Sequence, residues 1–294
     1  MTRPLDTLPR RRFLVATSLT LCALALRGYP VHAAASAHFT HGVASGDPLQ
    51  DRVILWTRVL PGSGLAQAIT VQWEVAVDEG FTQIVAQGQS RTGPERDYTV
   101  KVDAVGLLAG VRYFYRFIAQ GEHSTVGHTR TLPAVGVEAL QLAVLSCSNF
   151  PQGYFNVYRA VAERDYDVVV HLGDYIYEYA LGGYANPLME GKGREVQPEH
   201  EIVSLEDYRM RYGLYRSDAD LQAVHQAHPF ICVWDDHEIA NNTWQTGAQN
   251  HNAGEGEFAA RRRAAIQAFY EWLPIRESSS VEEGIIYRSA TSRH

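Results

Sequence analysis

The stretch LQLAVLSCSNFPQGYFNVYRAVAERDYDVVVHLGD, residues 140–174, decides how the second half of the chain folds. The apolar runs LQLAVLSC and DVVVHLGD enclose a segment in which Phe155, Tyr158, Val161 and Ala162 fall on one helical face. A strand, a helix and a second strand within about 35 residues form a βαβ unit. Such a unit requires parallel strands and a right-handed crossover.

A third strand and further helices extend this pattern. PFICVW, residues 229–234, is another buried strand. Before it, Ser204 followed by Asp207 is a capping-box signature that opens a helical region. After it, apolar residues recur at helical spacing over residues 255–272. The region from 140 to 294 is therefore predicted to be an α/β domain.

Residues 41–131 show a period of two instead. In ITVQWEVAV, residues 69–77, apolar and polar side chains alternate as they do in a half-buried antiparallel strand. Further strand-like runs occur at residues 51–59, 97–104 and 111–119. GLLAGVRYFYRF also resembles a strand of fibronectin type III modules. We therefore expect an immunoglobulin-like β-sandwich over residues 38–132.

The first 35 residues have the pattern of an export signal. Arg10-Arg11-Arg12-Phe13-Leu14 resembles the twin-arginine motif, and the small residues of VHAAASA suit a signal peptidase. The apolar run that follows the arginines is shorter than the ~20 residues that a spanning helix needs. We predict export by the twin-arginine machinery to the periplasm or the medium, without a stable membrane span; a membrane anchor is the alternative.

The composition is that of a globular protein without a nucleic-acid-binding patch. The formal net charge is −7, and the basic run ARRR, residues 260–263, lies in a helical pattern and is predicted to be a solvated face. Outside the signal only Cys147 and Cys232 remain, so either one bridge joins them or both are free. Cys232 and His171 lie within apolar strands and are predicted to be core residues.

Polar side chains follow each of the three strands of the predicted α/β domain. Parallel strands present their carboxyl ends at one edge of a sheet, so these side chains are expected to converge. Clustered carboxylates repel one another, and a bound cation is the ordinary remedy. Phenolate and thiolate suit a trivalent or borderline metal, whereas carboxylate and amide oxygens suit calcium. A dinuclear or larger site would perform in-line displacement at phosphorus with a metal-bound hydroxide. The candidates are Cys147, Asn149, Asp174, Tyr177, Asp235, Asp236 and His237.

Several stretches in the same order resemble the PhoD-type alkaline phosphatases. They are HGVASGDPLQDRVILWTRV, SCSNFPQGYFNVYRAVAERD, VVVHLGDYIYEY, VWDDHEIANNTW and FYEWLPIR. The resemblance covers roughly residues 39–289. It implies a β-sandwich followed by a calcineurin-like metallophosphatase domain, exported phosphomonoesterase or phosphodiesterase activity, and a centre of one ferric ion with calcium ions.

The resemblance also assigns roles to the motif residues. Cys147 and Tyr177 would be ligands of the iron, and Asp174 would bridge metals. Asp236 would be a further ligand, while His237 would contact the phosphate or protonate the leaving group.

Three neighbouring residues receive less definite roles from the same motifs. Asp235 would be a metal ligand, Asn149 would contact the phosphate or a metal, and Asn242 would act in one of these ways.

In the family, the later half of the metallophosphatase domain supplies further ligands. The chain ending at His294 is therefore expected to be an incomplete domain with little activity, and its sheet is expected to expose an apolar face. Two alternatives remain open. One is a non-catalytic exported binding protein or an inactive fragment, in which the sandwich binds a partner. The other is a zinc hydrolase, which is disfavoured because histidine is scarce among the candidate ligands.

Overall fold

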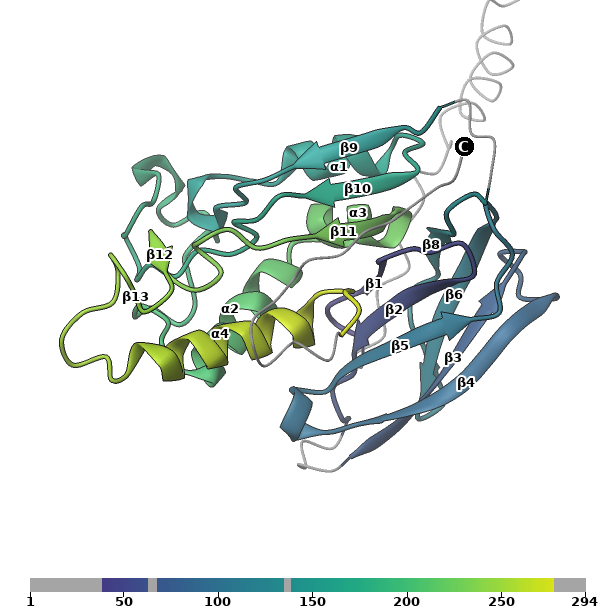
Figure 1. Ribbon diagram of the computed structural model, residues 1–294, viewed down its shortest axis with the longest axis horizontal. Coiled ribbons are helices and arrows are strands. Elements are labelled where there is room, and N and C mark those ends of the chain that lie inside the picture. Colours follow the sequence, from purple (N-terminus) through teal and green to yellow (C-terminus); the bar gives the residue numbers. More distant parts are fainter. Residues whose placement is uncertain (1–38, 63–67, 135–138, 278–294) are drawn as a thin grey trace, which may run out of the picture. The chain divides into compact units, whose positions relative to one another are not determined.

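The structure is a computed structural model that describes residues 39–62, 68–134 and 139–277 (Figure 1). The predicted export signal, residues 1–35, lies outside the described residues, as does the segment after residue 277. Within the described part of the chain, no helix has the length and apolar character to cross a membrane.

The predicted β region forms two layers of strands that enclose a core. One layer pairs β3 with β4 and β6, and β6 with β7 and β8. The other contains β1, β2 and β5, and side chains from both layers form one apolar cluster around Leu55, Val71 and Phe117. A β-sandwich is therefore confirmed. Its strands are β1 Val43–Gly46, β2 Arg52–Arg58, β3 Ile69–Ala76, β4 Ile84–Thr92, β5 Thr99–Val105, β6 Arg112–Ala119, β7 Glu122–His123 and β8 Gly127–Arg130.

The α/β region also follows the sequence prediction. Strands β9 (Leu142–Leu145), β10 (Val168–His171) and β11 (Pro229–Cys232) are parallel neighbours, with β10 in the middle. Helix α1 (Asn156–Ala162) connects β9 to β10. Because all three strands run in the same direction, their carboxyl ends lie at one edge (Figure 1).

Three longer helices and several short elements complete the α/β region. Ser204 caps α2 in the predicted capping box with Asp207. The longer helices are α2 Leu205–Arg216, α3 Ala219–Ala227 and α4 Phe258–Trp272. The short elements are the strands β12 Thr243–Trp244 and β13 Gly247–Ala248 and the 3₁₀ turns η1 Pro94–Arg96, η2 Phe150–Gln152 and η3 Pro187–Met189.

One sheet crosses from the sandwich into the α/β region. Its order is β5-β2-β1-β11-β10-β9, and β1 is parallel to β11 but antiparallel to β2. The junction is tight at Gly46, where a Cβ atom would lie 2.3 Å from the Pro274 carbonyl oxygen. Arg276 fastens the segment after α4 to the sandwich through a two-pronged ion pair with Asp103, at 2.8 and 3.0 Å.

Burial settles several of the smaller predictions. Cys232 and His171 are buried, as predicted, and no disulfide joins Cys147 to Cys232. The prediction that ARRR is wholly solvated is wrong for Arg261, which is buried and forms ion pairs with Glu201 and Glu255. These two carboxylates compensate the buried guanidinium.

The outer strand of the sheet does expose apolar side chains, as expected. On β9, Leu142 is 48% exposed and Val144 is 59% exposed, and Leu172 just beyond β10 is 50% exposed.

Candidate metal centre

Backbone hydrogen bonds tie the loops after β9 and β10 together. The amides of Cys147 and Ser148 donate to the carbonyls of Gly173 and Asp174, at 3.1 and 2.8 Å. Gly173 in turn lies against the loop after β11, because a Cβ at this residue would come within 2.3 Å of the Asp235 nitrogen. The three loops predicted to converge are therefore in direct contact.

Three non-glycine residues of this region have left-handed backbones. The φ angles are +61° at Cys147, +54° at Asp174 and +52° at Asn242. A left-handed conformation is costly for residues that carry a Cβ, and such strain gathers at functional sites because the surrounding structure must hold it. Here it turns two candidate ligand residues, Cys147 and Asp174, out of their strand directions.

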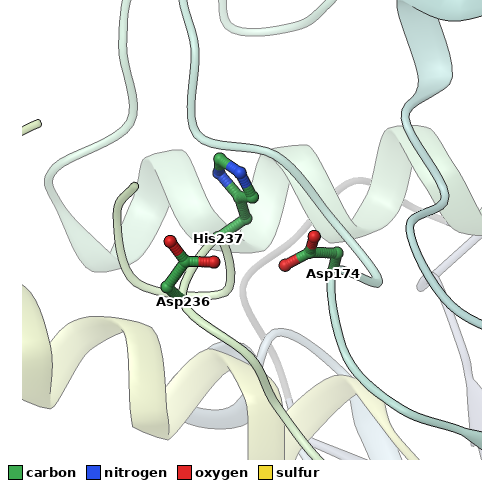
Figure 2. A group of neighbouring side chains, drawn as sticks. All are labelled: Asp174, Asp236 and His237. Atoms are coloured by element: carbon green, nitrogen blue, oxygen red, sulfur yellow. The ribbon is translucent and has the colours of Figure 1, made fainter. Parts of the chain in front are cut away.

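Asp174, Asp236 and His237 form a compact group of possible metal ligands. One ligand atom from each residue lies within 4.8 Å of the others. Figure 2 shows the two carboxylates turned toward one another with the imidazole beside them. Burial raises the pKa of Asp174, and the charges of Asp235 and Asp236 add to this effect, although His237 and Tyr177 oppose it.

Two buried oxygen atoms test whether a cation fits this group. Oδ1 of Asp174 and Oδ1 of Asn149 are both buried, and neither has a hydrogen-bond partner among the described residues. Unsatisfied buried acceptors are rare, and oxygen atoms of this kind are ligands of hard cations. The residues present therefore fit a bound metal ion.

Tyr177 and Cys147 border the group on one side. The Tyr177 hydroxyl donates to Oδ2 of Asp174 at 3.0 Å. Burial raises the pKa of Tyr177, and the neighbouring Asp174 and Cys147 raise it further. The phenol therefore keeps its proton beside these groups, whereas a cation would favour its deprotonation.

Glu178 is a site residue that the sequence prediction missed. Its buried carboxylate accepts a hydrogen bond from Nδ1 of His237 at 2.7 Å, and from Asn241 N and Asn250 Nδ2 at 2.8 Å each. Burial alone would lower the pKa of His237, but the bond to Glu178 and the nearby negative charges raise it. The signal was its place in GDYIYE, one residue after Tyr177.

Glu238 links the loop after β10 to the loop after β11. Its buried carboxylate accepts hydrogen bonds from the backbone N–H groups of Tyr175, at 2.6 Å, and Asp235, at 2.9 Å. Tyr175 follows Asp174 in the sequence, and Asp235 precedes Asp236. Burial raises the pKa of Glu238 to about 7 despite these two hydrogen bonds.

Asn149 and Asp235 lie at the margin of the group. The Asn149 amide donates to the Tyr184 carbonyl at 2.9 Å, so its nitrogen supports a loop while its oxygen is the unpartnered atom described above. Asp235 influences Asp174 through its charge but does not belong to the compact group of three. The backbone N–H of Asn242 donates to the Asp236 carboxylate.

Family models match both halves of the chain. Residues 142–292 match the model described as PhoD-like phosphatase, and residues 23–133 match that of the PhoD-like phosphatase N-terminal domain.

The chain belongs to the PhoD-like phosphatase family.

Two relatives support this membership. Alkaline phosphatase D of Bacillus subtilis (strain 168) is 42% identical over 294 residues, which cover 93% of this chain and 49% of the relative. A solved structure of PhoD matches with a TM-score of 0.75 and 44% identity, over 82% of this chain and 47% of the other. The chain thus spans about half the length of the relatives it matches.

Proposed function

We propose that this protein is an exported, metal-dependent phosphatase or phosphodiesterase that hydrolyses phosphate esters. The observation that carries the proposal is the compact group of Asp174, Asp236 and His237. Within it, the buried Oδ1 of Asp174 has no hydrogen-bond partner among the described residues. Homology to alkaline phosphatase D, a phosphoric ester hydrolase, supports the same reaction class.

In this proposal the carboxylates of the group bind the metal, and His237 contacts the substrate or transfers a proton. A metal bound there would neutralise the carboxylates, attract the phosphate ester and activate water for attack. Because a carboxylate only accepts hydrogen bonds, Glu178 holds the proton of His237 on Nδ1 and leaves Nε2 for the substrate. His237, whose pKa is raised, would then hydrogen-bond the phosphate or protonate the departing oxygen.

We propose ferric iron together with calcium as the metals. Thiolate and phenolate donors from Cys147 and Tyr177 suit a trivalent ion, and the carboxylate and amide oxygens suit calcium. Ferric iron bound to a phenolate absorbs visible light by charge transfer. Tyr177→Phe should abolish this absorption in the iron-containing protein, and a colourless, iron-free wild-type protein would contradict the choice of metal.

The substrate class is tested by hydrolysis in a chain extended to the length of its relatives. We expect p-nitrophenyl phosphate or its diester to be hydrolysed, with activity lost in chelator and restored by metal. His237→Asn should lower kcat by about a hundredfold, since general acid catalysis contributes roughly 10²–10⁴-fold. A binding protein without catalytic function would show no hydrolysis of either ester under any metal condition.

Export is the remaining part of the proposal, and it is supported by the sequence of residues 10–14. Replacing Arg10, Arg11 and Arg12 together by lysine should leave the precursor in the cytoplasm. Unchanged appearance of the triple variant outside the cytoplasm would remove the twin-arginine route.

A further inference from the structure

A cleft of about 510 Å³ leads away from the candidate metal centre. Cys147, Asn149 and Tyr177 line it, and the Tyr177 hydroxyl donates to Asp174, so the cleft adjoins the group described above. Tyr154 lines it from the segment before α1, Val157 from the first turn of α1, and Tyr184 from the loop after β10. If the phosphate of a substrate binds at the compact group of Asp174, Asp236 and His237, the organic part of that substrate can extend into this cleft.

The lining of the cleft is aromatic and uncharged. Tyr154 is 55% exposed and Tyr184 is 61% exposed, so both rings are accessible to a ligand. None of the described residues that line the cleft is Asp, Glu, Lys, Arg or His. The lining therefore suits a neutral group with a flat face. The Arg194 guanidinium, 5.5 Å from the centroid of the Tyr154 ring, is buried and already paired with Asp218.

The fold holds Tyr184 in place at some energetic cost. Its backbone is left-handed, with φ of +48°. Its carbonyl accepts hydrogen bonds from Asn149 Nδ2 at 2.9 Å and Gln152 Nε2 at 2.8 Å. The ring contacts Tyr177 and Tyr179, with centroids 5.9 and 5.7 Å away, yet most of it remains exposed. A strained backbone that presents an exposed ring beside a reactive group points to a binding role.

We propose that this cleft binds the alcohol part of the phosphate ester, and that it selects neutral, ring-bearing groups that stack on Tyr184. This inference rests on the proposed phosphate-ester function. It adds a substrate preference: an aryl or similarly flat alcohol is favoured over a small alkyl group and over an alcohol with its own negative charge.

Binding of phosphonates to the metal-loaded protein, in a chain extended to the length of its relatives, tests the proposal by calorimetry. Phenylphosphonate and methylphosphonate share the same anionic group and differ in the ring. We expect the wild type to bind phenylphosphonate about threefold to tenfold more tightly, the range of one aromatic contact. Phosphonoacetate, which carries an additional carboxylate, should bind no more tightly than methylphosphonate.

Variants of two residues that line the cleft locate the effect. Tyr184→Ala should remove the advantage of phenylphosphonate over methylphosphonate, a ratio of affinities in which any effect of the variant on the shared anionic group cancels. Tyr184→Phe keeps the ring and should behave as the wild type. Tyr154→Ala, with Tyr154→Phe as its control, provides an independent pair at a lining residue from another segment of the chain.

The outcomes separate this inference from the function on which it rests. If methylphosphonate binds but the phenyl group adds nothing, or if Tyr184→Ala and Tyr154→Ala both keep the full advantage, the substrate preference is wrong and the phosphatase proposal stands. If no phosphonate binds to the metal-loaded protein, both are wrong.

Discussion

The carboxylate of Glu178 shows how much a single buried residue controls in this site. It accepts three hydrogen bonds, including the one from His237, and it has no exposed surface. Burial alone would raise the pKa of Glu178, but the hydrogen bonds from His237, Asn250 and Asn241 outweigh burial and lower it. The residue is thus charged at neutral pH and fixes the orientation of the imidazole.

Glu178→Gln should therefore weaken His237 without removing it. We expect the pKa of His237 to fall, as seen by NMR titration of its ring, because the neighbouring negative charge is gone. In the chain extended to the length of its relatives, kcat should fall at least tenfold, a barrier increase of about 1.4 kcal/mol or more. Glu199→Gln, at an exposed position of the same region, is the control. An unchanged titration of His237 would show that the hydrogen bond has no such influence.

The residue scale also shows what a sequence pattern can and cannot predict. Asp174, Asp236 and His237 were predicted to converge because each follows a strand of one parallel sheet. The burial of Arg261 was not predictable, because its partner Glu201, sixty residues earlier in the chain, is brought to it only by tertiary packing. Helical periodicity indicates which face of a helix is apolar, but it does not indicate which carboxylates will pair with a buried arginine.

At the scale of elements, the turn after β10 tolerates only glycine at residue 173. Gly173 has φ of +105°, and a Cβ there would lie 2.3 Å from the Asp235 nitrogen and 2.7 Å from its Cβ. A glycine is therefore required both for the backbone conformation and for contact between the loops that carry Asp174 and Asp236.

Gly173→Ala should lower the free energy of unfolding by roughly 2 kcal/mol or more, since strain and overpacking add. Denaturant unfolding measures this loss. Gly191→Ala separates the two causes, because Gly191 has φ of +69° but open space around it, so only the strain of roughly 1–2 kcal/mol applies. Equal losses in the two variants would show that contact with the Asp235 loop contributes nothing.

The pairing of β1 with β11 lies beyond sequence prediction at this scale. Alternation in ITVQWEVAV and the apolar run of PFICVW indicate strands, and both strands are present as β3 and β11. Neither pattern tells which strand is the neighbour. The pairs Ser45–Pro229 and Gly46–Phe230 join residues far apart in the sequence, and their register depends on the packing of the whole sheet.

At the scale of the whole molecule, buried neutral histidines make stability depend on pH. Burial lowers the pKa of His225 well below its ordinary value of 6.5, and Arg216 lowers it further. The pKa of His171, also lowered by burial, is about 3. Below pH 6.5 the unfolded chain binds more protons than the folded one at these residues, so their effect is to destabilise the fold as the pH falls.

His225→Gln isolates one such contribution. Nε2 of His225 lies 2.8 Å from the Tyr175 hydroxyl, and glutamine retains a polar partner for that group. Between pH 6 and pH 4, the wild type should lose up to about 1.4 kcal/mol per pH unit more stability than the variant. Urea unfolding at several pH values measures the difference. Parallel stability curves for the two proteins would mean that His225 is not kept neutral by the fold.

The proposal for the whole molecule is that the edge at the ends of β9, β10 and β11 holds a metal. Asp174 is central to it: its Oδ2 accepts from Tyr177, its Oδ1 is unpartnered among the described residues, and it belongs to the compact group with Asp236 and His237. Asp174→Asn preserves shape but removes the charge that attracts a cation.

Metal content after equilibrium dialysis, measured by mass spectrometry on matched wild-type and Asp174→Asn proteins, tests this claim most directly. The account predicts stoichiometric iron with calcium in the wild type. In the variant, metal affinity should be at least tenfold weaker, or about 1.4 kcal/mol, and the melting temperature of the metal-free form should be nearly unchanged. Asp165→Asn, which alters an exposed carboxylate elsewhere, should bind metal as the wild type does. Equal metal content in wild type and Asp174→Asn, or none in either, would contradict the account.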